Sequence, residues 1–334
     1  MIDPWLLEHL VCPRCRGRVA LREGWLVCGE SHRYPVVDDI AVMVLGDVEP
    51  THWAITHALE HYQDTEALPA AVPDGGVDSV VQEAVSATCG NMYLHLVGNV
   101  PRYPIPIIAF DAPTGSAFLD IGCHWGRWCV SAARKGWRVI GIDPSLTGVR
   151  AAKRVAAQLG VKADFVVADG RYLPFEASSF DLVHSYSVLQ HFSEADVEKC
   201  AWEVGRVLRT EGRSHIQMAQ RFGVLNLFRQ ARRRFRQPRL FQVRYWPLAA
   251  LRSVFADAVG PTTLSVDGFF SINAQTADLD LLRPAHRALV HASNVLRRLA
   301  GQFPWLIRGA DSVYVNSRKG EAGVQTSRSI STSR

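Results

Sequence analysis

The sequence predicts a doubly wound α/β domain with a mostly parallel sheet over residues 116–220, on three observations. Short apolar runs alternate with amphipathic helical segments throughout this region. The runs are apolar almost without interruption, which is typical of parallel strands that helices cover on both faces. Glycines, including Gly136 and Gly160, close two of the helical segments.

The elements follow in a regular order. The strands are expected at residues 116–122, 137–143, 163–169, 180–187 and 213–219. The helices are expected at 127–136, 145–160 and 193–209, and Ser193 with Asp196 fits a capping box at the start of the last one. Further along the chain, two more strands at 262–270 and 311–319 enclose a helical insertion at 278–306.

Length and composition are those of an ordinary soluble protein. The chain has 334 residues, 48% of them hydrophobic and 21% charged, and a formal net charge of +5. No secretory signal or membrane-spanning run is evident, and seven unevenly placed cysteines favour a reducing compartment, with the cytoplasm as the default. We expect a compact domain at 1–45, a helical linker and lid segment at 46–115, the α/β domain with its insertions at 116–318, and a disordered tail at 319–334.

The loop "LDIGCHWG" is the candidate cofactor site, because it connects the first strand of the α/β domain to the first helix. Gly122 can take the turn out of the strand, and Gly126 can let the backbone approach a ligand closely. Asp143 ends the next strand, where a carboxylate binds ribose hydroxyls. Asp120 inside the loop would repel a pyrophosphate but attract an ammonium group. The loop therefore favours S-adenosylmethionine (SAM), which carries an amino acid and no phosphate.

With these motifs in order, residues 116–220 resemble a class I SAM-dependent methyltransferase, whose fold is Rossmann-like. The loop is similar to the family's first motif, Asp-x-Gly-x-Gly-x-Gly, and "VIGIDPS", "VVADGRYLPF" and "FDLVHSYSVLQHF" are similar to the next three. The resemblance also implies that the last two strands form an antiparallel pair ending the sheet. The implied cofactor contacts are Asp120 and Gly122 near the methionine part of SAM, Asp143 on the ribose, Asp169 at the adenine amino group, and the peptide around Ser185 on the methyl-transfer face.

Two positions depart from the family pattern. His124 stands where the first motif has its middle glycine, so this backbone position can be met without glycine, and the side chain is a candidate contact for the SAM carboxylate or the substrate. Arg213 replaces the second glycine of the family's turn before the fifth strand, and this difference casts little doubt on the resemblance.

Residues 1–45 carry a candidate zinc site. Cys12 and Cys15 are separated by two residues, and Cys28 and His32 by three, which is the spacing of a tetrahedral Cys3His site on a small ribbon. The segment resembles the zinc-ribbon activator subunits of tRNA and protein methyltransferases and the N-terminal finger of ribosomal RNA guanine methyltransferases. Unpaired core cysteines are the alternative. The other four cysteines, Cys89, Cys123, Cys129 and Cys200, have no ligand spacing.

On the substrate side, His191 follows the fourth strand, where a base could take a proton from an oxygen or nitrogen acceptor. A structural hydrogen-bonding role is the alternative, and Tyr186 is a weaker catalytic candidate. We expect residues 92–108 and the insertion at 278–306 to form a helical cap over the pocket. Aromatic side chains are candidate pocket walls, namely Phe222, Trp246, Phe269 and Phe270.

The leading hypothesis is methylation of a small-molecule acceptor, with specialised metabolism as a candidate setting and no obligate protein partner evident. It rests on the large insertion, the mild net charge and the absence of an Asn/Asp-Pro-Pro-Tyr motif at the fourth strand. An RNA methyltransferase is the runner-up, since residues 228–239 hold six arginines and no acid. That run is equally interpreted as a solvated helix face or as a site for an anionic small molecule. A non-catalytic SAM-binding scaffold is the third hypothesis.

Overall fold

The structure is a computed structural model that describes residues 2–62, 76–236, 238 and 241–320. Residues 321–334 of the expected disordered tail at 319–334 lie outside the described part, as do residues 63–75 of the expected linker and lid segment at 46–115. Within the described residues, no helix combines the length and the apolar composition that crossing a bilayer requires.

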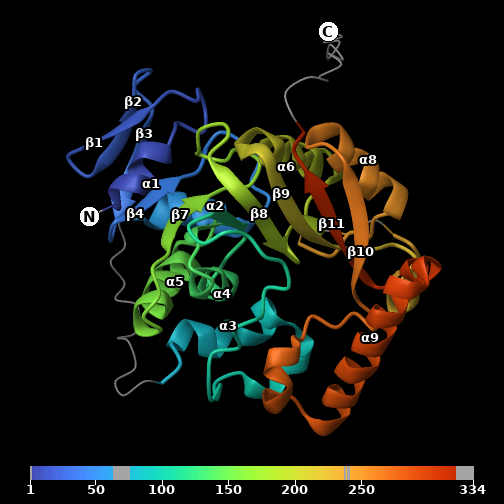
Figure 1. Ribbon diagram of the computed structural model, residues 1–334. Helices are drawn as coiled ribbons and strands as arrows, with labels where there is room; N and C mark the ends of the chain where they lie inside the picture. The colour runs from blue at the N-terminus through green and yellow to red at the C-terminus, as the bar shows by residue number, and fades with distance from the viewer. Residues whose placement is uncertain (1, 63–75, 237, 239–240, 321–334) are drawn as a thin grey trace.

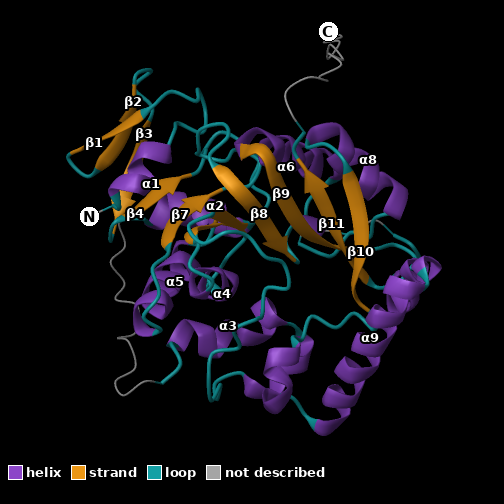
Figure 2. Cartoon of the chain, viewed as in Figure 1, coloured by secondary structure: helices purple, strands orange, loops and turns teal. Residues whose placement is uncertain are grey.

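The described residues form a mixed sheet of eleven strands in the order β1-β2-β3-β4-β7-β6-β5-β8-β9-β11-β10 (Figure 2). Its centre is parallel, and β11 pairs antiparallel with both β9 and β10. This arrangement confirms the predicted doubly wound, mostly parallel α/β fold. The strands of this part are β5 (Ala117–Ile121), β6 (Arg138–Asp143), β7 (Asp164–Ala168), β8 (Phe180–Tyr186), β9 (Leu208–Ala219), β10 (Thr262–Gly268) and β11 (Ser312–Arg318).

Helices cover both faces of the sheet, as the uninterrupted apolar strands predict (Figure 1). One apolar cluster joins the sheet to α2, α4 and α5, and another joins it to α1, α6 and α8. Ser193 caps α6 by accepting from the amide of Asp196 at 3.2 Å, as its sequence predicts. These helices are α1 (Pro4–His9), α2 (Trp53–His61), α4 (Arg127–Arg134), α5 (Leu146–Gln158), α6 (Glu194–Val207) and α8 (Leu248–Ala258).

The N-terminal lobe extends the sheet, which sequence analysis did not predict. Its strands are β1 (Val19–Arg22), β2 (Trp25–Cys28), β3 (Arg33–Val37) and β4 (Ile40–Met43). β4 pairs parallel with β7, with Ala41 opposite Val166. Leu26 and Tyr34 of the lobe belong to the same buried cluster as Val166, so the lobe and the sheet share one core.

Four further elements contribute to a third apolar cluster at the side of α5. Tyr93 is buried there and donates its hydroxyl to Asp278 at 2.6 Å, and Trp125 donates its indole N–H to Thr88 at 2.9 Å. These elements are α3 (Ser79–Cys89), the 3₁₀ turns η2 (Asn91–Leu96) and η4 (Thr276–Leu281), and α9 (Pro284–Gln302). The described residues form three more elements: η3 (Leu189–His191), α7 (Val224–Arg232) and η5 (Pro304–Gly309).

His215 on β9 should make folding sensitive to acid. Burial lowers the pKa of His215 to about 4, and its ring stacks on Phe110 with centroids 3.9 Å apart. Between about pH 6.5 and pH 4, this histidine is protonated in the unfolded chain but neutral in the folded chain. The free energy of unfolding therefore decreases as the pH falls through this range. The contribution is at most about 3 kcal/mol.

His215→Phe keeps the aromatic stack and removes this titration, so urea unfolding at pH 7 and pH 4.5 should show a smaller loss of stability in the variant. Replacing the exposed His57 with phenylalanine is the control and should leave the acid sensitivity as it is. An equal loss of stability in His215→Phe and in the unmodified chain would contradict the assignment.

Candidate functional site

A cavity of about 350 Å³ lies at the carboxyl ends of the parallel strands, where open α/β sheets bind ligands. Gly122 follows β5, Asp143 ends β6 and Asp169 follows β7, so three successive strands each contribute one predicted cofactor residue to its wall. His124, Tyr186 and His191 also line it. The structure thus brings six of the nine predicted cofactor and catalytic residues together around one space.

The loop after β5 requires glycine at two positions, for packing reasons. Gly122 has φ +80°, and a Cβ there would lie 2.3 Å from Val188. Gly126 also has φ +80°, and a Cβ would lie 3.1 Å from Ala152 and 3.2 Å from Phe165. Gly126 does not line the cavity. The close approach expected of it is therefore an approach to α5 and β7 instead of to a ligand.

His124 takes the place of the middle glycine in the left-handed conformation, with φ 43°. Its backbone N–H donates to Asp143 at 3.0 Å, which holds the strained turn against the end of β6. Asp143 accepts a second backbone N–H, from Ser145, at 2.9 Å. Burial raises the pKa of Asp143. Each carboxylate oxygen keeps a lone pair for the cavity, which is what two ribose hydroxyls need.

Asp169 is buried and lies on the cavity wall, but its carboxylate is held by Arg171. The guanidinium of Arg171 donates to Oδ2 at 2.7 and 3.0 Å and to Oδ1 at 3.2 Å, and it also bonds Asp196 on α6 at 3.0 Å. This network fixes the turn after β7. An arginine two residues after the acid is the one local signal of this network. The adenine contact implied for Asp169 stays a prediction.

Asp120 and Ser185 lie behind the cavity wall, as Gly126 does. Asp120 shares the α4 face of β5 with Phe118, because side chains alternate along a strand, and it accepts from His184 at 2.8 Å. Ser185 donates to the carbonyl of Ile121 at 2.8 Å and ties β8 to the end of β5. Neither lines the cavity, so direct contact with the cofactor, as implied by the resemblance, does not follow from their positions.

His191 is held as a neutral ring with a defined tautomer. Its Nδ1 lies 2.8 Å from the carbonyl of Phe241, an acceptor, so Nδ1 carries the proton and Nε2 the lone pair. The ring stacks on Phe241 with centroids 4.1 Å apart. Burial lowers the pKa of His191 to about 4. The lone pair is therefore available throughout the neutral pH range.

Tyr186 stays protonated, because burial and the neighbouring Asp267 raise its pKa well above the usual value. Its hydroxyl lies 3.3 Å from both Asp267 and Gln275. It also lines a second, small cavity of about 30 Å³, together with Asp267 and Arg297. Tyr186 is thus a hydrogen-bonding group between the two cavities.

Sequence analysis missed several wall residues. Thr51 to Ile55 line the cavity from the segment that leaves β4, and Ala87 and Thr88 line it from α3. Arg127 at the start of α4 is 4% exposed and lines the cavity; its Nη2 lies 3.4 Å from the buried Asp278, and its Nε has no partner among the described residues. A buried guanidinium with an unused donor suits a carboxylate ligand.

The expected pocket walls and cap lie elsewhere. Residues 92–108 and 278–306 contribute nothing to the cavity at the ends of the parallel strands, because their buried apolar side chains pack in the third cluster. Phe222, Trp246, Phe269 and Phe270 do not line it either; Trp246 and Phe269 are core residues and Phe222 is exposed. The aromatic walls are instead Trp53, Trp125, Trp128, Phe192 and Phe241.

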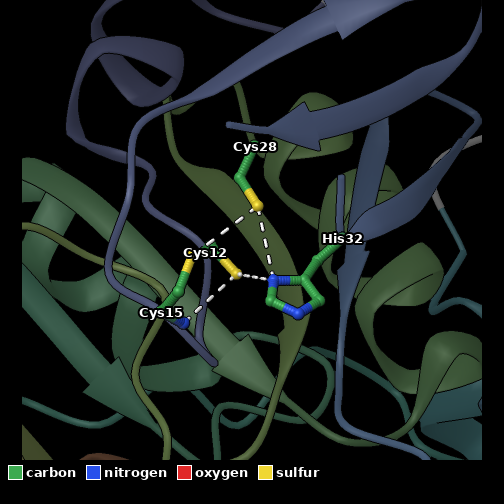
Figure 3. A group of neighbouring side chains, drawn as sticks. All are labelled: Cys12, Cys15, Cys28 and His32. Atoms are coloured by element: carbon green, nitrogen blue, oxygen red, sulfur yellow. Dashed lines mark hydrogen bonds between the residues drawn. The ribbon is translucent and has the colours of Figure 1, made fainter. Parts of the chain in front are cut away.

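The four predicted zinc ligands converge in the N-terminal lobe (Figure 3). Their ligand atoms lie within 4.8 Å of one another. The sulfurs of Cys15 and Cys28 are 3.6 Å apart, and Nδ1 of His32 lies 3.5 Å from the sulfur of Cys12 and 3.4 Å from that of Cys28. A tetrahedral zinc ion would separate two sulfurs by about 3.8 Å and a sulfur and a nitrogen by about 3.5 Å. The four residues therefore fit a zinc ion.

The ligands are joined to the α/β domain by backbone bonds and ion pairs. Beside Cys12, the amide of Val11 donates to Pro174 at 2.9 Å. Arg16, next to Cys15, donates to the carbonyl of Leu173 at 2.7 Å and pairs with Glu203 of α6 at 2.9 Å. A metal at this site would thus stabilise the junction between the lobe and the sheet.

Comparison with known proteins agrees with this fold. Residues 118–212 match the model of a family described as "Methyltransferase domain". This part of the chain is thus similar to a methyltransferase domain, the class that its motifs predict.

The curated relatives match less than a third of the chain. A ubiquinone biosynthesis O-methyltransferase of Brucella ovis is 39% identical over 97 residues, which is 29% of this chain and 37% of the relative. The enzyme of the same name from Chelativorans is 35% identical over 89 residues, 26% of this chain and 35% of the relative. The chain thus spans little more than a third of the length of these relatives. A solved phosphoethanolamine N-methyltransferase 2 of Haemonchus contortus, in complex with S-adenosyl-L-methionine, superposes with a TM-score of 0.47 at 18% identity, covering 76% of this chain and 61% of that one.

Proposed function

We propose that the protein is an enzyme that transfers a methyl group from SAM to a small-molecule acceptor, and that the acceptor atom is a hydroxyl oxygen. The observation that carries the proposal is the cavity walled by Gly122, Asp143 and Asp169 at the ends of three adjacent parallel strands. The methyltransferase-domain match and the O-methyltransferase names of the relatives support it.

The residues of the cavity have separate roles in this proposal. Asp143 binds the ribose hydroxyls, and Arg127 binds the carboxylate of the amino-acid moiety with its unused Nε donor. Trp128 and Phe241 supply apolar walls that exclude water. When bound, SAM supplies the methyl group. His191 accepts the acceptor's hydroxyl proton at Nε2, the atom that its bond to Phe241 leaves free.

The test is turnover of purified protein with SAM and a panel of hydroxylated small molecules, followed as S-adenosylhomocysteine formation. Acceptor-dependent product is the expected result. SAM binding without turnover on hydroxyl, amine or carbon acceptors would favour the scaffold hypothesis, and turnover on RNA alone would favour the RNA hypothesis.

His191→Gln should lower the rate of methyl transfer about 100-fold, because glutamine accepts a hydrogen bond but cannot take the proton. SAM affinity should stay within a factor of about 2, since the ribose and carboxylate contacts remain. The rate of the unmodified enzyme should show no loss from protonation of His191 until the pH approaches about 4. A merely structural His191 would instead change SAM affinity and rate together and leave the shape of the pH profile unaltered.

A further inference from the structure

Helix α7 buries its polar side and exposes its apolar side, which is the reverse of an ordinary surface helix. Gly223, Asn226 and Gln230 on its inner side are buried, although two of them are polar. Val224 and Phe228 on its outer side are 62% and 59% exposed, and Leu227 and Ala231 lie on the same exposed stripe. An apolar stripe at this helical spacing normally faces a core. Here it faces solvent.

Hydrogen bonds fix this orientation. The side-chain amide of Asn226 donates to the carbonyls of Gln220, at 2.8 Å, and Asp311, at 2.6 Å. The amide of Gln230 donates to the carbonyl of Arg221 at 2.7 Å. Rotating the helix to bury its apolar stripe would break these buried bonds and leave their partners unsatisfied. The exposed stripe is therefore a stable feature of the fold.

More apolar side chains extend the surface at both ends of α7. Phe222 precedes the helix with 53% of its surface exposed, and Phe235 follows it with 65% exposed. Gln220 donates to the carbonyls of Ile307 and Arg308, which places η5 beside the start of α7. Trp305 of η5 is 66% exposed. Several large exposed apolar side chains on neighbouring segments mark a candidate interaction site.

The charged side chains of the segment that contains α7 are basic. Between Glu211 and Asp257 the chain holds ten arginines and no aspartate or glutamate. Arg229, Arg232 and Arg234 are exposed, and in the part of the chain that the structure describes none of them forms an ion pair. The apolar stripe is thus flanked by unneutralised cations.

We propose that this face, centred on Val224, Leu227 and Phe228, docks on the surface of an anionic lipid bilayer. The helix would lie in the interface plane with its apolar stripe among the acyl chains and its arginines at the lipid phosphates. RNA would engage the arginines and stack on the phenylalanines, but it offers nothing to Val224 and Leu227. The outward aliphatic side chains therefore favour lipid. Docking of this type needs no membrane-spanning helix.

Phe241 follows α7 in the chain; it is 43% exposed and lines the cavity at the ends of β5, β6 and β7. Residues of this return segment are bound to the cavity wall, since the amide of Arg244 donates to the carbonyl of Gln190 at 2.7 Å. The docking surface and the cavity are therefore connected through one short segment.

Cosedimentation of the full chain with vesicles tests the proposal. We expect binding to vesicles of phosphatidylcholine and phosphatidylglycerol in equal parts, and binding at least about tenfold weaker to phosphatidylcholine alone. Val224→Ser with Phe228→Ser should weaken binding to the anionic vesicles about tenfold or more. A matched control replaces two exposed apolar residues elsewhere, Ile107→Ser with Trp202→Ser, and should bind as the unmodified chain does.

A second readout does not depend on the stability of the double variant. Brominated lipid should quench part of the tryptophan fluorescence, and Trp305→Phe should remove that part. Equal binding to neutral and anionic vesicles, unchanged binding of the double variant, or an RNA gel shift with no vesicle binding would each overturn the proposal.

Discussion

Replacing Asp143 with asparagine should weaken SAM binding by a factor of about 10 to 100, because charge-assisted bonds to two ribose hydroxyls become neutral ones and one acceptor is lost. The fold should survive, since asparagine keeps the shape of the side chain and its oxygen can still accept one of the two amides, from His124 or Ser145. Isothermal titration calorimetry with SAM at pH 7 measures the effect.

Asp164→Asn is the matched control. Asp164 begins β7, at the amino end of the strand and away from the cavity, and its replacement removes one acid from the same sheet. SAM affinity should be unchanged in this variant. Equal affinity of Asp143→Asn and the unmodified chain would show that Asp143 does not bind the ribose, and the cofactor assignment of the cavity would lose its main support.

Loss of the zinc site should destabilise the protein as a whole. Cys28→Ser removes one of the four ligands, and Cys28 lies at the end of β2 within the core that the lobe shares with the sheet. We expect zinc content to fall from one equivalent to near zero and the free energy of unfolding to decrease by about 3 kcal/mol or more. Metal analysis and urea unfolding measure the two effects.

Cys89→Ser separates zinc loss from the general cost of replacing a buried cysteine. Cys89 is buried in α3, outside the ligand cluster, so this variant should be destabilised modestly and retain its zinc. Treatment of the unmodified chain with a strong chelator should reproduce the Cys28→Ser phenotype. A chain that purifies without zinc and is equally stable with and without a chelator would contradict the site.

The α/β domain was predictable because its signals are local. Uninterrupted apolar runs and capping residues such as Ser193 specify each strand and helix, and Asp143 stands at the end of a strand that these signals locate. The ligand spacing of the N-terminal cysteines and His32 likewise predicted a cluster that the structure brings together.

The rest depends on contacts between distant segments. Nothing within Ile40–Met43 indicates that this strand pairs with Asp164–Ala168, since parallel pairing has no local signature. The same holds for Trp53, which reaches the cavity only because β4 joins the sheet there. For α7 the local signal was misleading, because its apolar stripe predicts a buried face, whereas the buried amides of Asn226 and Gln230 hold it outward.

Native mass spectrometry of the purified protein, with and without added SAM, tests the central claim most directly. The account predicts one zinc ion on the protein as isolated, one SAM molecule after addition, and a much smaller SAM-bound fraction in Asp143→Asn at a SAM concentration near the dissociation constant of the unmodified chain. A folded, zinc-bearing protein that takes up no SAM would contradict the assignment of the cavity at the ends of β5, β6 and β7 as a SAM site.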